Sequence, residues 1–202
     1  MTNKSERHIV SASAVIPARR ERVYSLIANY NDGHPRILPS QFTGLVVEQG
    51  GVGAGTVIRF QMSVFGSKRT FRAAITEPEP GRVLVETDLD SNGVVTTFTV
   101  NPGGAPADSY VTISTELPVR GGFLGKFERT AATFLLRPIY LRELENLARV
   151  ATGHAKPVPR SGPGSASCPS GPAGRSRHQL AAAAPRARPG RRALAAWVRG
   201  TR

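Results

Sequence analysis

Apolar and polar residues alternate along the first patterned stretch of the chain, from His8 to Ile16. Val10, Ala12 and Ala14 share one face of this stretch with Ile16, and polar side chains lie between them. A period of two residues is typical of a strand that is buried on one side. The pattern therefore predicts a half-buried strand at the start of the chain.

A short helix is predicted next, because Val23, Leu26 and Ile27 recur at helical spacing after Pro17. A proline near the start of a helix is favourable, since its missing N–H would have no helical partner there. Residues 30–39 contain Gly, Asn, Asp and two prolines, which disfavour a long element. We expect a short helix or a loop over this stretch.

The middle of the chain consists of short apolar runs divided by turn residues. We predict six strands, at residues 42–49, 56–65, 69–77, 82–89, 94–100 and 110–117. The dividing segments are rich in Gly, Pro, Asn and Asp, and this close, regular spacing indicates an antiparallel sheet. One divider, GGVGAG at 50–55, superficially resembles a nucleotide-binding loop. A strand pattern follows it instead of a helix, which favours a hairpin turn.

The dipeptide Asn92-Gly93 predicts a two-residue hairpin turn, because a type I′ turn requires positive φ at both central positions. Under this turn three residue pairs would share one face of the sheet: Leu89 with Thr96, Thr87 with Phe98, and Val85 with Val100. The register predicted by the turn therefore agrees with the apolar pattern.

A long helix is predicted from Phe123 to Ala151, with apolar residues recurring at spacings of three and four and a kink at Pro138. At a rise of about 1.5 Å per residue, this helix is about 40 Å long. A seven-stranded antiparallel sheet with one apolar face needs a cover, and only this helix is large enough. The expected fold is α+β, with the sheet wrapped on a long C-terminal helix.

Charge divides the chain into two parts. Residues 1–154 carry 17 basic and 14 acidic side chains, whereas residues 155–202 carry 10 basic and none acidic. We therefore expect a folded domain at 1–154 and a low-complexity, disordered basic tail at 155–202. Three interpretations of the tail stay open: non-specific contact with nucleic acid or an anionic membrane, an inert extension, or the product of a shifted reading frame.

Several classes of protein are disfavoured by the remaining composition. The lone Cys168 disfavours a disulfide framework or a Cys-cluster zinc site, and the histidines lack the spacing typical of metal ligands. No apolar run reaches the roughly 18 residues of a membrane span, and the start of the chain has no apolar signal core. We expect a cytoplasmic protein without a metal or other cofactor.

Four segments of the sequence resemble the helix-grip proteins of the SRPBCC superfamily, which includes START-like lipid-transfer domains and polyketide cyclase/dehydrase-like proteins. They are VSASAVIPARRERVYSLIANY, GGVGAGTVIRF, ITEPEPGRVLVE and LLRPIYLRELENLARVA. Many members have a Trp after the first helix, where this chain has His34-Pro35-Arg36-Ile37, which puts the ligand-entrance wall in doubt. The resemblance implies a cavity between sheet and helix that binds or carries a hydrophobic, lipid- or polyketide-like small molecule.

The predicted register assigns a set of side chains to that cavity, and none of them is charged. They are Ile58, Phe60, Met62, Phe71, Ala73, Ile75, Val83, Val85, Thr96, Phe98, Ile113, Leu135 and Tyr140. Glu86 is assigned to the opposite, solvated face, and the charged residues of the long helix to a solvated helix face. An apolar cavity with a few hydroxyls suits a binder rather than a catalyst.

An enzyme of the polyketide cyclase/dehydrase type is the alternative. In that case His34, Arg36 or Tyr140 at the cavity mouth would polarise a carbonyl or carry a proton. The sequence itself favours a solvated loop position for His34 and core packing for Tyr140. A third hypothesis is an interaction protein that uses the basic tail.

Overall fold

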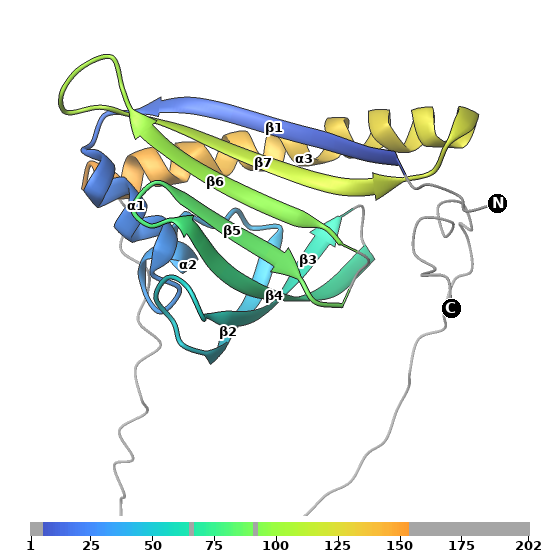
Figure 1. Ribbon diagram of the computed structural model, residues 1–202, viewed down its shortest axis with the longest axis horizontal. Helices are drawn as coiled ribbons and strands as arrows, with labels where there is room; N and C mark the ends of the chain where they lie inside the picture. Colours follow the sequence, from blue (N-terminus) through green and yellow to red (C-terminus); the bar gives the residue numbers. More distant parts are fainter. Residues whose placement is uncertain (1–5, 65–66, 91–92, 154–202) are drawn as a thin grey trace, which may run out of the picture. The chain divides into compact units, whose positions relative to one another are not determined.

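A computed structural model of the protein describes residues 6–64, 67–90 and 93–153 (Figure 1). These residues form seven strands and three helices, close to the predicted positions. The elements are β1 (Glu6–Ile16), α1 (Arg20–Ala28), α2 (Gly33–Ile37), β2 (Phe42–Gln49), β3 (Val57–Val64), β4 (Ser67–Glu79), β5 (Val83–Asp88), β6 (Val95–Pro102), β7 (Ser109–Val119) and α3 (Gly122–Ala151).

The seven strands make one antiparallel sheet with the order β1-β7-β6-β5-β4-β3-β2. The first strand pairs with the last, so the two edge strands, β1 and β2, follow each other in the sequence with only α1 and α2 between them. This arrangement confirms the predicted α+β class and the antiparallel sheet.

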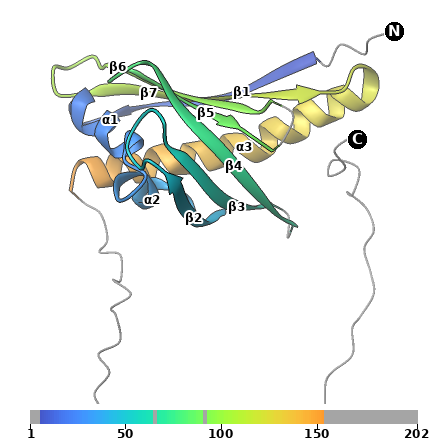
Figure 2. The ribbon, with the colours of Figure 1, turned by 60° about the horizontal axis from the view of Figure 1, so that its bottom comes forward.

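The long helix α3 runs along the sheet, with α1 and α2 beside its C-terminal half (Figure 2). Its buried side recurs at the helical period and supplies the apolar side chains Ala132, Ile139, Leu144, Leu147 and Val150. These side chains pack with inward-facing strand residues into one hydrophobic core. Burial of the apolar faces of the sheet and helix is the main stabilising contribution.

The GGVGAG segment connects β2 to its antiparallel neighbour β3, as the hairpin prediction requires. Its backbone also contacts the first helical segment, since the Gly53 N–H donates to Ala28 O and the Tyr30 N–H donates to Gly51 O. Gly51 and Gly53 have φ values of 130° and 63°, in the left-handed region that favours glycine. The loop therefore fixes the position of the α1–α2 connection.

The outer face of the sheet is polar where β2, β3 and β4 meet. Glu48 accepts from Arg59 Nε at 3.1 Å and from Arg72 Nε at 2.6 Å. All three side chains are solvent-accessible, so these contacts organise the surface and contribute little to stability. Arg59 and Arg72 therefore lie on the solvated face of the sheet.

The pattern of contacts between residues divides the chain into two units, 1–157 and 158–202. All described residues belong to the first unit. The predicted disorder and partners of the tail at 155–202 therefore lie outside the described residues. Within the part that is described, no helix is both long and apolar enough to cross a membrane.

Candidate functional site

The inner face of the sheet, opposite α3, is apolar over most of its length. Of the predicted cavity residues, six are buried: Ile58, Ala73, Ile75, Phe98, Ile113 and Tyr140. Five more are half-buried: Phe60, Met62, Phe71, Thr96 and Leu135. The strand residues of this set form the apolar wall of the candidate site, whereas on α3 Leu136, the neighbour of Leu135, packs against the core.

The half-buried aromatic residues cluster on β2, β3 and β4. Phe60 stacks on Phe71 with ring centroids 5.5 Å apart, and it contacts Phe42 at 5.7 Å. Because these rings stay partly accessible, they are the part of the wall that α3 covers least. Large aromatic surfaces of this kind offer favourable contact area to an apolar ligand.

The assignment of Val83 and Val85 to the inner face is wrong. The register pairs Leu84 with Phe98 and Glu86 with Thr96, so Leu84 and Glu86 face inward. Leu84 has no exposed surface, whereas Leu89, which the predicted turn placed inside, is 48% exposed. The backbone N–H of Asp88 donates a hydrogen bond to Val94 O. The connection between these two paired residues therefore has five residues, whereas the predicted hairpin turn has two. A shift of three positions moves every side chain of β5 to the other face.

His34 is buried in the interior, which corrects its assignment to a solvated loop. Only 3% of the residue is exposed, and its ring stacks on Tyr30 and meets Phe98 edge-on. His34 Nδ1 lies 2.7 Å from Ile27 O, and a carbonyl only accepts, so Nδ1 carries the proton. Burial lowers the pKa of His34, which favours the neutral ring with a bare Nε2.

Glu86 faces His34 from β5 and is largely buried, with 13% of its side chain exposed. Tyr30 donates its hydroxyl to Glu86 Oε1 at 2.6 Å, and His34 Nε2 lies 3.7 Å from the same oxygen. The second distance is too long for a hydrogen bond. Two acceptors therefore face each other across a short gap.

Glu143 on α3 is a second buried carboxyl in this region, contrary to the solvated helix face expected from the sequence. The residue is 3% exposed, and its Oε1 has no hydrogen-bond partner among the described residues. Burial, followed by repulsion from Glu86, raises the pKa of Glu143. An unsatisfied buried carboxyl is costly, so its presence indicates a role other than packing.

A chain of hydroxyl groups connects α3 to the sheet. Tyr140 OH lies 2.5 Å from Thr115 Oγ1, which lies 2.8 Å from Thr96 Oγ1. Burial raises the pKa of Tyr140, so its hydroxyl stays protonated. Tyr140 is buried, in agreement with the core packing that the sequence favours.

The structure therefore brings two of the three catalytic candidates, His34 and Tyr140, into the interior. Arg36 points elsewhere and forms an ion pair with Asp32 at 3.6 Å. Tyr30, Glu86 and Glu143 complete the polar group with His34, and we call these four residues the polar cluster. No group of metal-binding side chains with suitable geometry occurs among the residues that the structure describes.

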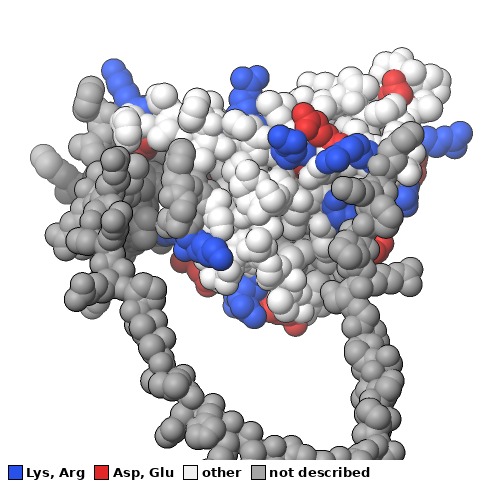
Figure 3. Space-filling model, turned by 180° about the vertical axis from the view of Figure 1, so that it is seen from behind, with Lys and Arg blue, Asp and Glu red and all other residues white. Residues whose placement is uncertain are grey.

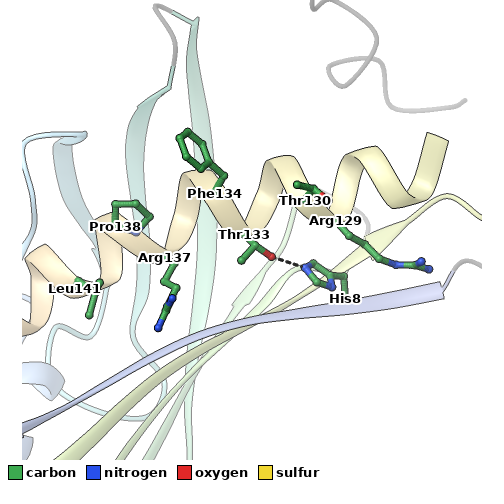
Figure 4. A pocket seen from close by; sticks show the side chains of 8 residues that line it. All are labelled: His8, Arg129, Thr130, Thr133, Phe134, Arg137, Pro138 and Leu141. Carbon is green, nitrogen blue, oxygen red and sulfur yellow. Dashed lines mark hydrogen bonds between the residues drawn. The ribbon is translucent and has the colours of Figure 1, made fainter. Parts of the chain in front are cut away.

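A groove of about 560 Å³ lies apart from this interior, along α3 and the edge strand β1 (Figure 4). It is lined by His8, Arg129, Thr130, Thr133, Phe134, Arg137, Pro138 and Leu141. His8 Nε2 lies 2.9 Å from Thr133 Oγ1, and Phe134 is 75% exposed. None of the predicted cavity residues lines this groove. The groove is therefore an alternative ligand position, which experiments must distinguish from the site between sheet and helix.

Charged side chains are dispersed over the visible part of the domain surface. Figure 3 shows single Lys and Arg side chains separated by uncharged surface and by acidic neighbours, outside the grey atoms. Nucleic-acid binding usually requires a continuous basic patch or stripe. The part of this face that is visible in Figure 3 shows no such feature.

The fold, with an apolar inner face and a polar cluster at its α1–α2 end, defines a helix-grip protein. Residues 7–152 match the family described as polyketide cyclase / dehydrase and lipid transport. The chain belongs to this family. The activities in that description concern hydrophobic small molecules, polyketides and lipids.

Solved structures agree with this assignment. The NMR structure of the KanY protein is 31% identical, with a TM-score of 0.64, and the match covers 73% of this chain and 99% of that one. The Zhui aromatase/cyclase from Streptomyces sp. R1128 is 13% identical (TM-score 0.59; 73% and 94% covered). Norcoclaurine synthase from Thalictrum flavum is also 13% identical (TM-score 0.59; 75% and 98% covered). The last two show the fold alone. A search of curated proteins gives no match.

Proposed function

We propose that the protein binds a hydrophobic small molecule between the inner face of the sheet and α3. The observation that carries this proposal is the presence of an apolar wall and an unsatisfied buried carboxyl oxygen in the same interior. Phe60 and Phe71 offer partly accessible aromatic surface, whereas Glu143 holds an unpartnered oxygen in the interior. A site of this composition binds the body of a ligand by apolar contact and orients it by a few polar groups.

A cyclase/dehydrase activity is the second candidate, and the polar cluster favours it. No acid or base was predicted for the cavity, but Glu143 on α3 and His34 on α2 are buried in the interior, and Glu86 on β5 is largely buried there. A neutral His34 accepts a proton at Nε2, and a buried carboxyl with a raised pKa donates one. These groups supply the proton transfers that aldol-type ring closure and loss of water require.

Titration with the neutral fluorescent probe N-phenylnaphthylamine tests the binding proposal. We expect a saturable rise in fluorescence with one site per chain, because the probe leaves water for an apolar site. Fluorescence that increases without saturation, or does not increase, would contradict the proposal. If the site is also catalytic, a poly-β-ketone analogue should be cyclised, and His34→Gln should slow turnover more than it weakens binding of the neutral probe.

A further inference from the structure

We propose that the polar end of the natural ligand is a protonated primary amine, held by Glu143, Glu86 and His34. This inference rests on the proposed binding site and specifies the chemical class of its ligand. It follows from the balance of hydrogen-bond donors and acceptors in the polar cluster.

The polar cluster has more acceptors than donors. Among the described residues, Glu143 Oε1 has no hydrogen-bond partner, and Glu86 accepts a hydrogen bond from Tyr30 OH. His34 donates from Nδ1 to Ile27 O, so its Nε2 is a third acceptor in the neutral ring. A ligand that completes this cluster must bring donors.

Cationic side chains do not fill this need in the part of the chain that the structure describes. Within the described residues the basic group nearest to Glu86 is His34 Nε2, at 3.7 Å in a neutral ring, and Glu143 has no ion pair. The titratable groups facing the two carboxyls are Tyr30 and His34 from the α1–α2 region and Tyr140 from α3. These groups include no Lys or Arg, and buried carboxylates are stable only when paired with a cation or protonated.

An alkylammonium group matches this arrangement in charge and in number of donors. It carries one positive charge and three N–H donors, against the two carboxyls and the imidazole Nε2. An alcohol offers one donor and no charge, and a carboxylate offers no donor and adds a negative charge beside Glu86. The cluster therefore discriminates among ligands that have the same hydrocarbon body.

The apolar wall lies where the hydrocarbon body of such an amine would extend. Glu86 is paired with Ile75 on β4 and with Thr96 on β6. Phe98 contacts the edge of the His34 ring, and Leu84 pairs with Phe98. A ligand bound through its ammonium group thus meets apolar side chains directly beside the polar cluster.

Displacement of N-phenylnaphthylamine from the full chain at pH 7.5 tests the inference with three matched ligands: decylamine, decanol and decanoate. We expect decylamine to displace the probe at a concentration about tenfold or more below decanol, with decanoate weakest, because a charge-assisted hydrogen bond is roughly twice as strong as a neutral one. Glu143→Gln should reduce the preference for the amine over the alcohol. The exposed neighbour substitution Glu145→Gln should leave it unchanged.

Each outcome has a definite meaning. Equal displacement by decylamine and decanol, or the strongest displacement by decanoate, overturns the amine inference and leaves the binding site intact. A failure of the probe itself to bind overturns the proposed function instead. The comparison of ligands on the parent protein requires no variant, so it stands even if Glu143→Gln does not fold.

Discussion

Replacing Ala73 with Phe should remove the saturable binding of N-phenylnaphthylamine. Ala73 is 4% exposed on the inner face of β4, where it pairs with Ile58 of β3. A phenyl ring at this position would project between the sheet and α3 and occupy the space that the probe needs. We expect a loss of affinity of at least about tenfold, with an overpacking cost of about 1–3 kcal/mol in the free energy of unfolding.

The neighbouring substitution Ala74→Phe is the matched control. Ala74 is half-buried on the opposite face of β4, where it pairs with Val57 and Thr87. This variant adds the same ring to the same strand and should bind the probe like the parent. Thermal unfolding and circular dichroism would show that both variants are folded. Parent-like affinity in a folded Ala73→Phe protein would mean that the probe does not bind between sheet and helix.

Glu143→Gln should stabilise the protein at pH 8 by about 1 kcal/mol or more, since each unit by which the pKa of a carboxyl rises on folding corresponds to about 1.4 kcal/mol. Glu143 is 3% exposed with an unpartnered Oε1, and burial raises its pKa. The amide removes the ionisation that the interior disfavours. A gain of this kind would indicate that the parent retains a costly group for function rather than for stability.

The stabilisation of the protein by Glu143→Gln should be larger at high pH than at low pH. Above the ordinary carboxyl pKa the unfolded chain releases the proton of Glu143 while the native state holds it. The native state then binds more protons, and its stability falls as the pH rises. Below about pH 4 both states hold the proton, and the contribution of ionisation to the gain disappears. The lowered pKa of His34 affects parent and variant alike, so its effect cancels.

Urea unfolding at pH 4 and pH 8, with Glu145→Gln as the exposed control, measures this difference. We expect the Glu143→Gln gain at pH 8 to exceed that at pH 4, and the Glu145→Gln variant to match the parent at both. An equal effect of Glu143→Gln at the two pH values would show that ionisation of Glu143 is not the cause.

Most of the fold could be predicted from local patterns. The strand at Phe42–Gln49 has the predicted bounds, and the long helix begins within one residue of its predicted start. Such patterns are reliable because alternation and helical recurrence reflect burial of one face, which is decided within each element. The resemblance to the family then predicted how these elements are arranged, as a helix-grip fold.

The register of β5 was predicted wrongly, because it was derived from a two-residue turn at Asn92-Gly93. Both registers bring apolar residues inside, but the observed one buries Leu84, which Val83 and Val85 flank. The choice depends on packing against Phe98 and the helices, and a single hairpin does not contain that information. The error also assigned Glu86 to the solvent face, so this member of the polar cluster was not predicted.

Glu143 could have been found from the sequence alone. It follows Tyr140 by three residues and precedes Leu147 by four, so it belongs to the buried stripe of the helix. His34 is different, because its burial results from the stacking of Tyr30 and the packing of α2 against the core. No local periodicity over residues 30–39 indicates that contact.

The position of a bound ligand is the most direct test of the proposed function. An isotope-filtered NOE spectrum of methyl-labelled protein with N-phenylnaphthylamine distinguishes the interior from the outer groove. We predict NOEs from the naphthyl protons to the methyl groups of Ile58, Ile75 and Ile113, which lie on the inner face and are each 1% exposed. NOEs confined to Thr130 and Leu141, which line the groove along α3, would contradict a ligand site between sheet and helix.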